Sequence, residues 1–188
     1  MALVMTINLK VEIFRQQTKN WLNCFLLCFL AQQAVEKIDR TRGHAAQLFA
    51  KLLTSPLDIP HIPRKSEVLL CFPEQLRQPG SKFDEFGWSV ESETFPIYAK
   101  LLNLPEYCEK VLLGLVISVG GVTERLVRQS SLYMFKELEN MNSGQLTDFG
   151  QMLIKIFTVS IKVSHFINCA LFLLWFMKFH VFRKTPLT

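Results

Sequence analysis

The stretch from Tyr98 to Leu138 constrains the fold most, because it has the pattern of two helices joined at a pair of glycines. On both sides of the glycines, apolar residues recur at spacings of three and four, which places them on one face of a helix. Gly120 and Gly121 can adopt the positive φ that ends a helix, and Thr123 can cap the next one. We therefore predict an αα-hairpin. Its apolar faces are Tyr107, Val111, Leu112, Leu115, Val116 and Val119, then Leu126, Val127, Tyr133, Met134, Leu138 and Met141.

An αα-hairpin leaves apolar surface on its outer sides, which neighbouring helices have to cover. The chain has 188 residues and 49% of them are hydrophobic, so one domain with a sizeable core can form. The sequence therefore predicts an all-α fold in which the hairpin is one layer of a helical bundle or of a stack of helical repeats.

A long helix is predicted before the hairpin. The apolar run WLNCFLLCFLA, which begins at Trp21, is too short to cross a bilayer, since a spanning helix takes about twenty apolar residues. We expect it to be the buried start of a helix that continues through Phe49 and ends near Ser55. Gly43 weakens this helix by roughly 1 kcal/mol relative to alanine and allows a bend. The inward stripe is Ala34, Ile38, Ala45, Leu48, Phe49 and Leu52, and the outward face is Glu36, Lys37, Asp39, Arg40 and Arg42.

Residues 56–96 form a long proline-rich connector. Its helix-breaking residues recur too often for a long helix or a central strand. We expect it to cross the surface of the helices, with a short helix near Val68. Phe83, Phe86 and Trp88 are its aromatic anchors, which either pin it to the helices, the interpretation we favour, or form a partner-binding site. The breaking residues are Pro56, Pro60, Pro63, Pro73, Pro79 and Gly80.

After the hairpin, a turn is predicted at residues 140–144 and a further helix from Gln145 to Phe157. The pattern again places apolar residues on one face. They are Leu146, Phe149, Met152, Leu153 and Phe157.

The last segment, residues 158–188, is a divergent apolar tail. Residues 163–182 carry one full charge, Lys178, and as a helix they would be about 30 Å long, the thickness of the hydrocarbon layer. Polar side chains interrupt this run, which leaves an uninterrupted apolar core only from Cys169 to Met177. Three interpretations stay open: first the product of an alternative exon or a read-through gene model, then a membrane anchor, then a buried solenoid helix.

The net charge of +5 does not indicate a nucleic-acid-binding protein, because of where the charge lies. Residues 1–30 carry +2 and residues 158–188 carry +4, which leaves −1 for everything between. A phosphate-binding face needs basic residues clustered on one folded surface. No nucleic-acid partner is predicted.

No group of residues predicts catalysis. The chain has five cysteines, an odd number without paired spacing, which favours a reduced cytosolic compartment. Cys24 and Cys28 stand one helical turn apart, but no second pair or histidine at suitable spacing completes a metal site. The four histidines lie far apart in the chain. We therefore predict no catalytic, cofactor or metal site, and an enzyme is the least expected class.

The candidate site is a partner-binding corner at the hairpin, made of Gly120, Gly121, Glu124, Arg125 and Arg128. The three charged residues fall in the first turns of the second helix. The alternative is a solvated face on which Glu124 and Arg128 form an ion pair at i, i+4, contributing a few tenths of a kcal/mol.

Two blocks of the sequence resemble one protein family. The run from Leu112 to Ser131, preceded by FPIYAKLLNLPEYCEKV, and the earlier block AQQAVEKIDRTRGHAAQLF at Ala31 to Phe49, are similar to the C-terminal region of tubulin folding cofactor D, also called tubulin-specific chaperone D. The blocks occur in the family's order. The resemblance covers residues 31–157, and residues 1–30 are a helical segment partly outside the family pattern. It implies a fold of the HEAT or armadillo type, a fragment of an α-solenoid in which helix pairs stack.

The resemblance implies a function in tubulin folding. Family members bind β-tubulin after its release from the chaperonin and, with other tubulin folding cofactors and an Arf-like small GTPase, help to assemble the α/β heterodimer. They also take part in stimulating GTP hydrolysis by tubulin. The implied protein is a truncated cofactor in the cytoplasm, at the microtubule cytoskeleton. The alternatives are a membrane-anchored helical protein that uses residues 163–182, and a helical scaffold without tubulin activity.

Overall fold

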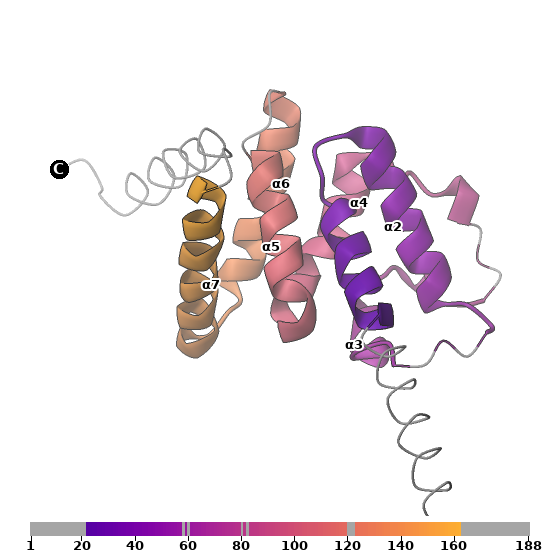
Figure 1. The fold of residues 1–188 in the computed structure, drawn as a ribbon. Helices are drawn as coiled ribbons and strands as arrows, with labels where there is room; N and C mark the ends of the chain where they lie inside the picture. Colours follow the sequence, from indigo (N-terminus) through magenta and orange to yellow (C-terminus); the bar gives the residue numbers. More distant parts are fainter. Residues whose placement is uncertain are drawn as a thin grey trace, which may run out of the picture.

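The computed structural model describes residues 22–57, 59, 61–79, 81, 83–119 and 123–162. All regular secondary structure in these residues is helical, which confirms the all-α prediction. The long helices lie side by side, with α2 towards one end and α7 at the other, as in a fragment of an α-solenoid (Figure 1). The elements are a helix over residues 22–33, then α2 (Asp39–Leu53), α3 (Lys65–Cys71), η1 (Glu74–Leu76), η2 (Phe83–Glu85), α4 (Glu91–Ala99), η3 (Lys100–Asn103), α5 (Pro105–Val119), α6 (Glu124–Glu139) and α7 (Ser143–Lys162).

The predicted hairpin is present. Helices α5 and α6 pack against each other, both contact η3, and α6 also packs on α4. All six apolar residues predicted for the first face are buried, whereas on the second face Val127 and Tyr133 are only half-buried and the other four are buried. Gly120 and Gly121 lie outside the described residues. Thr123 is the N-cap residue of α6, but its side chain makes no capping hydrogen bond, so that part of the prediction is wrong.

An aromatic cluster forms the centre of the core. Phe49 from α2 meets the ring of Tyr98 edge to face, with the ring centroids 5.4 Å apart. Phe72 and Tyr107 complete the cluster, and all four side chains are buried. Each buried phenol finds an acceptor, since Tyr98 donates to the Ala46 carbonyl at 2.6 Å and Tyr107 to the Pro63 carbonyl at 3.0 Å. The cluster therefore joins α2, α4 and α5 to the connector.

The single helix predicted before the hairpin is two helices. The chain leaves the first helix at residues 34–38 and re-enters helix at Asp39. A Cβ placed at Gly43 of α2 would stand 2.5 Å from Ser89 Oγ, so the glycine allows the connector to lie against the helix. The break comes at residues 34–38 because this turn is held by long-range hydrogen bonds, described below.

The apolar face predicted for this region is partly wrong. Ile38 and Leu48 were expected inside and are exposed. The run WLNCFLLCFLA is buried on one side only. Leu27, Cys28, Leu30 and Ala31 are buried, and Leu22, Phe25, Leu26 and Phe29 are exposed.

The connector is more helical and more deeply buried than predicted. It contains the expected short helix near Val68, which is α3, and its end is already helical, because α4 begins at Glu91 and includes Pro96. Phe83 and Trp88 are buried, and Trp88 donates its indole N–H to the Phe83 carbonyl at 2.6 Å. The aromatic anchors therefore pin the connector, as we favoured. Its other buried apolar side chains are Ile62, Val68, Phe72, Leu76 and Phe95.

Helix α7 begins two residues earlier than predicted. Asn142 accepts a hydrogen bond from the Gln145 amide at 2.9 Å, and the Gln145 side chain accepts one from the Asn142 amide at 3.0 Å. This reciprocal pair is a capping box, which satisfies amides that would otherwise lack partners and starts the helix at Ser143. Phe149 and Phe157 are buried as expected, whereas Leu146 is exposed.

None of the helices that the structure describes is long and apolar enough to cross a membrane. The tail interpretations for residues 163–182 fall outside the described residues.

Candidate functional site

The structure places the three described residues of the predicted site at an exposed corner. Glu124, Arg125 and Arg128 lie in the first turns of α6, and all three are exposed. Within the described part of the chain, no ion pair joins Glu124 to Arg128, so the predicted i, i+4 pair is wrong. The two side chains therefore do not neutralise each other at the corner.

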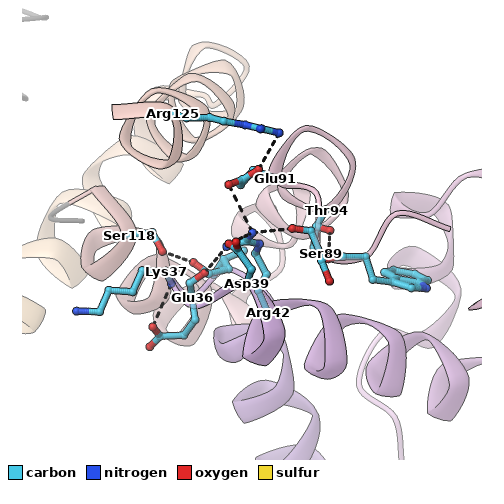
Figure 2. A network of polar contacts seen from close by, with 11 residues as sticks. Glu36, Lys37, Asp39, Arg42, Ser89, Glu91, Thr94, Ser118 and Arg125 are labelled. Atoms are coloured by element: carbon cyan, nitrogen blue, oxygen red, sulfur yellow. Dashed lines mark hydrogen bonds and ion pairs between the residues drawn. The ribbon is translucent and has the colours of Figure 1, made fainter. Parts of the chain in front are cut away.

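Arg125 forms its ion pair with a residue of another helix. Its guanidinium lies 3.2 Å from the Glu91 carboxylate at the start of α4, and the Glu91 side chain is only 12% exposed (Figure 2). The other carboxylate oxygen of Glu91 lies 3.6 Å from the guanidinium of Arg42 on α2. One carboxylate therefore stands between two cations and connects three helices.

Arg42 is the residue around which this corner is built. Its side chain was predicted to point into solvent, but it is fully buried. The guanidinium donates to the Asp39 carboxylate at 2.6 Å, to the Glu36 carbonyl at 2.9 Å and to the Ser89 carbonyl at 2.8 Å. A buried charge is tolerated only when such partners replace the lost water.

The surroundings of Arg42 supply one further favourable contact and one unsatisfied group. Its guanidinium carbon lies 5.5 Å from the centroid of the Phe95 ring, within the range of a cation–π interaction. Its Nε atom is buried and has no hydrogen-bond partner among the residues that the structure describes. The sequence carried a signal for this burial: Arg42 lies three residues before Ala45 and seven before Phe49, on the inward stripe.

The turn between the first two helices is held at the same corner. The Ser118 hydroxyl of α5 donates a short hydrogen bond to the Val35 carbonyl, while Arg42 holds the Glu36 carbonyl (Figure 2). Gly114, one turn earlier on α5, faces the same turn, and a Cβ there would stand 2.5 Å from the Gln32 carbonyl oxygen. Contacts from α2 and α5 therefore add to the local hydrogen bonds that the turn makes with the end of the first helix.

The cysteines are separate from this corner. Cys28 donates to the Glu106 carbonyl at 3.1 Å, and burial raises the pKa of its thiol from 9.0 to about 12. Cys24, Cys28, Cys71 and Cys108 are all free. In the described ranges, no three histidine, cysteine, aspartate or glutamate side chains come together as a group that could hold a metal ion.

A hollow of about 570 Å³ opens in the connector. Its lining consists of Gln75, Leu76, Gln78, Pro79, Ser81, Glu85 and Phe86. The corner itself offers charged side chains above a buried polar network. Such an arrangement can hold a protein surface by ion pairing, and Arg125 and Arg128 are its outermost cations.

Comparisons with known proteins agree on one family. Residues 25–178 match the model described as "Tubulin folding cofactor D C terminal". Tubulin-specific chaperone D from Dictyostelium discoideum is 29% identical over 106 residues, which make up 55% of this chain but only 7% of that protein. No solved structure matches. The matched range includes residues 158–178, which we had expected to diverge from the family pattern.

Proposed function

Because the chain belongs to the tubulin folding cofactor D family, through that family's C-terminal domain, we propose that it binds β-tubulin and assists assembly of the α/β-tubulin heterodimer. The observation that carries the proposal is the match over residues 25–178, which includes every helix described from α2 to α7. The match covers only 7% of its much longer relative. The activity of the whole cofactor is therefore a proposal for this chain.

The fold supports binding as the mode of action. A row of stacked helices presents a long surface on which a large partner can rest. The chain therefore acts by binding an unpaired tubulin subunit and not as an enzyme. Its contribution to GTP hydrolysis by tubulin comes from stabilising one conformation of the bound subunit. The chain acts in the cytoplasm, near microtubules. Other tubulin folding cofactors and an Arf-like small GTPase are the further partners.

We propose that the contact is made at the α5–α6 corner, at Arg125 and Arg128 together with Glu124 and the glycines Gly120 and Gly121. Arg128 is exposed and has no ion-pair partner among the described residues, so it can bind a carboxylate without first breaking a contact. Arg125 is already paired with Glu91, and this pair orients its guanidinium at the rim. Charged groups at a rim mainly speed association and select the partner.

The test measures retention of β-tubulin, freed from chaperonin, on the immobilised chain. We expect the wild-type chain to retain β-tubulin and Arg128→Glu to lower the affinity about tenfold, which corresponds to roughly 1.4 kcal/mol. Lys136→Glu is the matched control, because Lys136 is exposed on the same helix two turns further along. Its retention should equal that of the wild type.

Two results would count against these proposals in different ways. If the wild-type chain retains no tubulin where a full-length family member does, tubulin binding by this chain is refuted. If Arg128→Glu and Lys136→Glu weaken retention equally, binding stands but the corner is not the contact. The stimulated rate of GTP hydrolysis by tubulin, measured with the same variants, tests the GTPase contribution.

A further inference from the structure

Glu91 connects the buried network to the exposed corner. Its side chain is 12% exposed, and its carboxylate lies between two guanidinium groups, 3.6 Å from that of Arg42 and 3.2 Å from that of Arg125 (Figure 2). The Arg42 side chain is fully buried, whereas the Arg125 side chain is 67% exposed. The three side chains therefore lead from the core of the protein to its surface.

The position of Glu91 is fixed from two directions. It is the first residue of α4, and the first turn of this helix is held by the Thr94 hydroxyl, which donates to the Trp88 carbonyl at 2.7 Å. The helix dipole also favours a carboxylate at this end. On its other side stands Arg42, which is itself anchored to the Ser89 carbonyl at 2.8 Å. The carboxylate of Glu91 is therefore held in one place.

Arg125 uses only part of its hydrogen-bonding capacity on this contact. The ion pair with Glu91 involves one terminal nitrogen, Nη2, and no other partner of the Arg125 side chain lies among the described residues. A guanidinium has five N–H donors in a planar fork, which can bind a carboxylate through two of them at once. A long exposed side chain loses rotamer freedom when it binds, and pairing with a fixed carboxylate reduces that loss in advance.

We propose that Glu91 is a positioning residue for tubulin binding, which holds Arg125 so that the remaining donors of its guanidinium bind a carboxylate of the tubulin subunit. This role rests on the proposed function and adds to it the chemistry of the partner at Arg125. Glu91 does not touch the partner and acts only through Arg125. Because Arg42 shares the charge of Glu91, Arg125 is not fully neutralised and attracts a second carboxylate.

The kinetics of β-tubulin binding to the immobilised chain test this role. We expect Glu91→Gln to raise the dissociation rate about fivefold, an effect within the range found for residues of one ion-pair network, and to leave the association rate nearly unchanged. Glutamine has nearly the same size but no charge, so Arg125 loses its fixed partner. Glu93→Gln is the matched control, because Glu93 is exposed on the same helix and its replacement removes the same charge. Its dissociation rate should equal that of the wild type.

A double-mutant cycle shows whether Glu91 acts through Arg125. In a chain that carries Arg125→Ala, Glu91→Gln should not change the dissociation rate further. Arg125→Lys keeps the charge but lacks the fork, so this variant should dissociate nearly as fast as Arg125→Ala. Arg125 is exposed, so its variants test the fork even if Glu91→Gln weakens the fold. Circular dichroism of each variant checks that the chain is folded.

Four results would overturn the proposal while leaving tubulin binding intact. Glu91→Gln could dissociate like the wild type. It could dissociate faster to the same extent with and without Arg125, which would mean that Glu91 acts through the fold. Glu93→Gln could have the same effect, which would assign the change to net charge. Arg125→Lys could behave like the wild type, which would mean that no fork is used. If the wild-type chain retains no tubulin, the proposed function itself is refuted, and this role with it.

Discussion

At the scale of single residues, Arg42 decides how the first helices of the chain are arranged. Its guanidinium holds one carbonyl in the turn after the first helix, another in the connector, and the carboxylate of Asp39. If the cation were removed, the Glu36 and Ser89 carbonyls would each lose a hydrogen bond, whereas the Asp39 side chain is 67% exposed and can bind water instead. The cost of removing one partner from such a network exceeds the net value of the hydrogen bonds themselves.

Arg42→Met should therefore destabilise the protein by about 3 kcal/mol, because methionine keeps the apolar stem and deletes every donor. Urea unfolding followed by circular dichroism measures the change. Arg40→Met is the matched control on the same helix, since Arg40 is exposed and should change the free energy of unfolding by less than about 0.5 kcal/mol. A loss as small as that of the control would mean that the buried network contributes little to stability.

At the scale of elements, two glycines inside helices set how closely neighbouring segments pack. Gly43 on α2 lies against Ser89 of the connector, and Gly114 on α5 lies against the turn after the first helix. At Gly114 a Cβ would meet a backbone oxygen, Gln32 O, and the Cγ2 atom of Val35 at 2.6 Å. Backbone cannot move aside as a flexible side chain can, so the helices themselves would have to separate.

Gly114→Ala should accordingly cost about 1–3 kcal/mol, although alanine is the better helix former by about 1 kcal/mol. Thermal unfolding of the variant measures the loss. Lys110→Ala, at a half-exposed position one turn earlier on the same helix, is the matched control and should be nearly neutral, since lysine and alanine are both good helix formers. If Gly114→Ala were as stable as Lys110→Ala, the first helix and α5 would not approach as closely as described.

At the scale of the whole molecule, the core holds several groups that must stay protonated. Burial raises the pKa of Cys28 to about 12 and the pKa of both Cys71 and Cys108 to about 11, against 9.0 for a free thiol. Burial also raises the pKa of the Tyr98 phenol well above its usual value of 10.0. In the unfolded chain the thiols lose their protons near their ordinary pKa, whereas the folded chain keeps them.

The free energy of unfolding should therefore fall as pH rises above about 9. In that range the unfolded state binds fewer protons than the folded state, so higher pH favours unfolding, and the stabilisation is complete only below the unfolded pKa. Urea midpoints measured under reducing conditions from about pH 8 to about pH 11 follow the effect. Cys28→Ala combined with Cys108→Ala should flatten the slope, and a midpoint that does not change with pH would refute the prediction.

The candidate site shows where prediction from sequence succeeds and where it stops. The exposure of Glu124, Arg125 and Arg128 followed from their place at the start of an amphipathic helix, and the structure agrees. The partner of Arg125 did not follow, because Glu91 belongs to another helix 34 positions earlier and only the packing of α4 on α6 brings the two together.

The sequence by itself determined that this chain is helical, that α5 and α6 form a hairpin, and that α3 and α7 exist, because apolar spacing acts locally and needs no knowledge of neighbours. Only the tertiary structure decided where the first helix ends, that Arg42 is buried and that the connector belongs to the core. The carbonyl of Val35 is held by Ser118, 83 positions away, and Arg42 by Ser89, 47 positions away. Such contacts depend on which surfaces meet after folding, and periodicity along the chain carries no record of them.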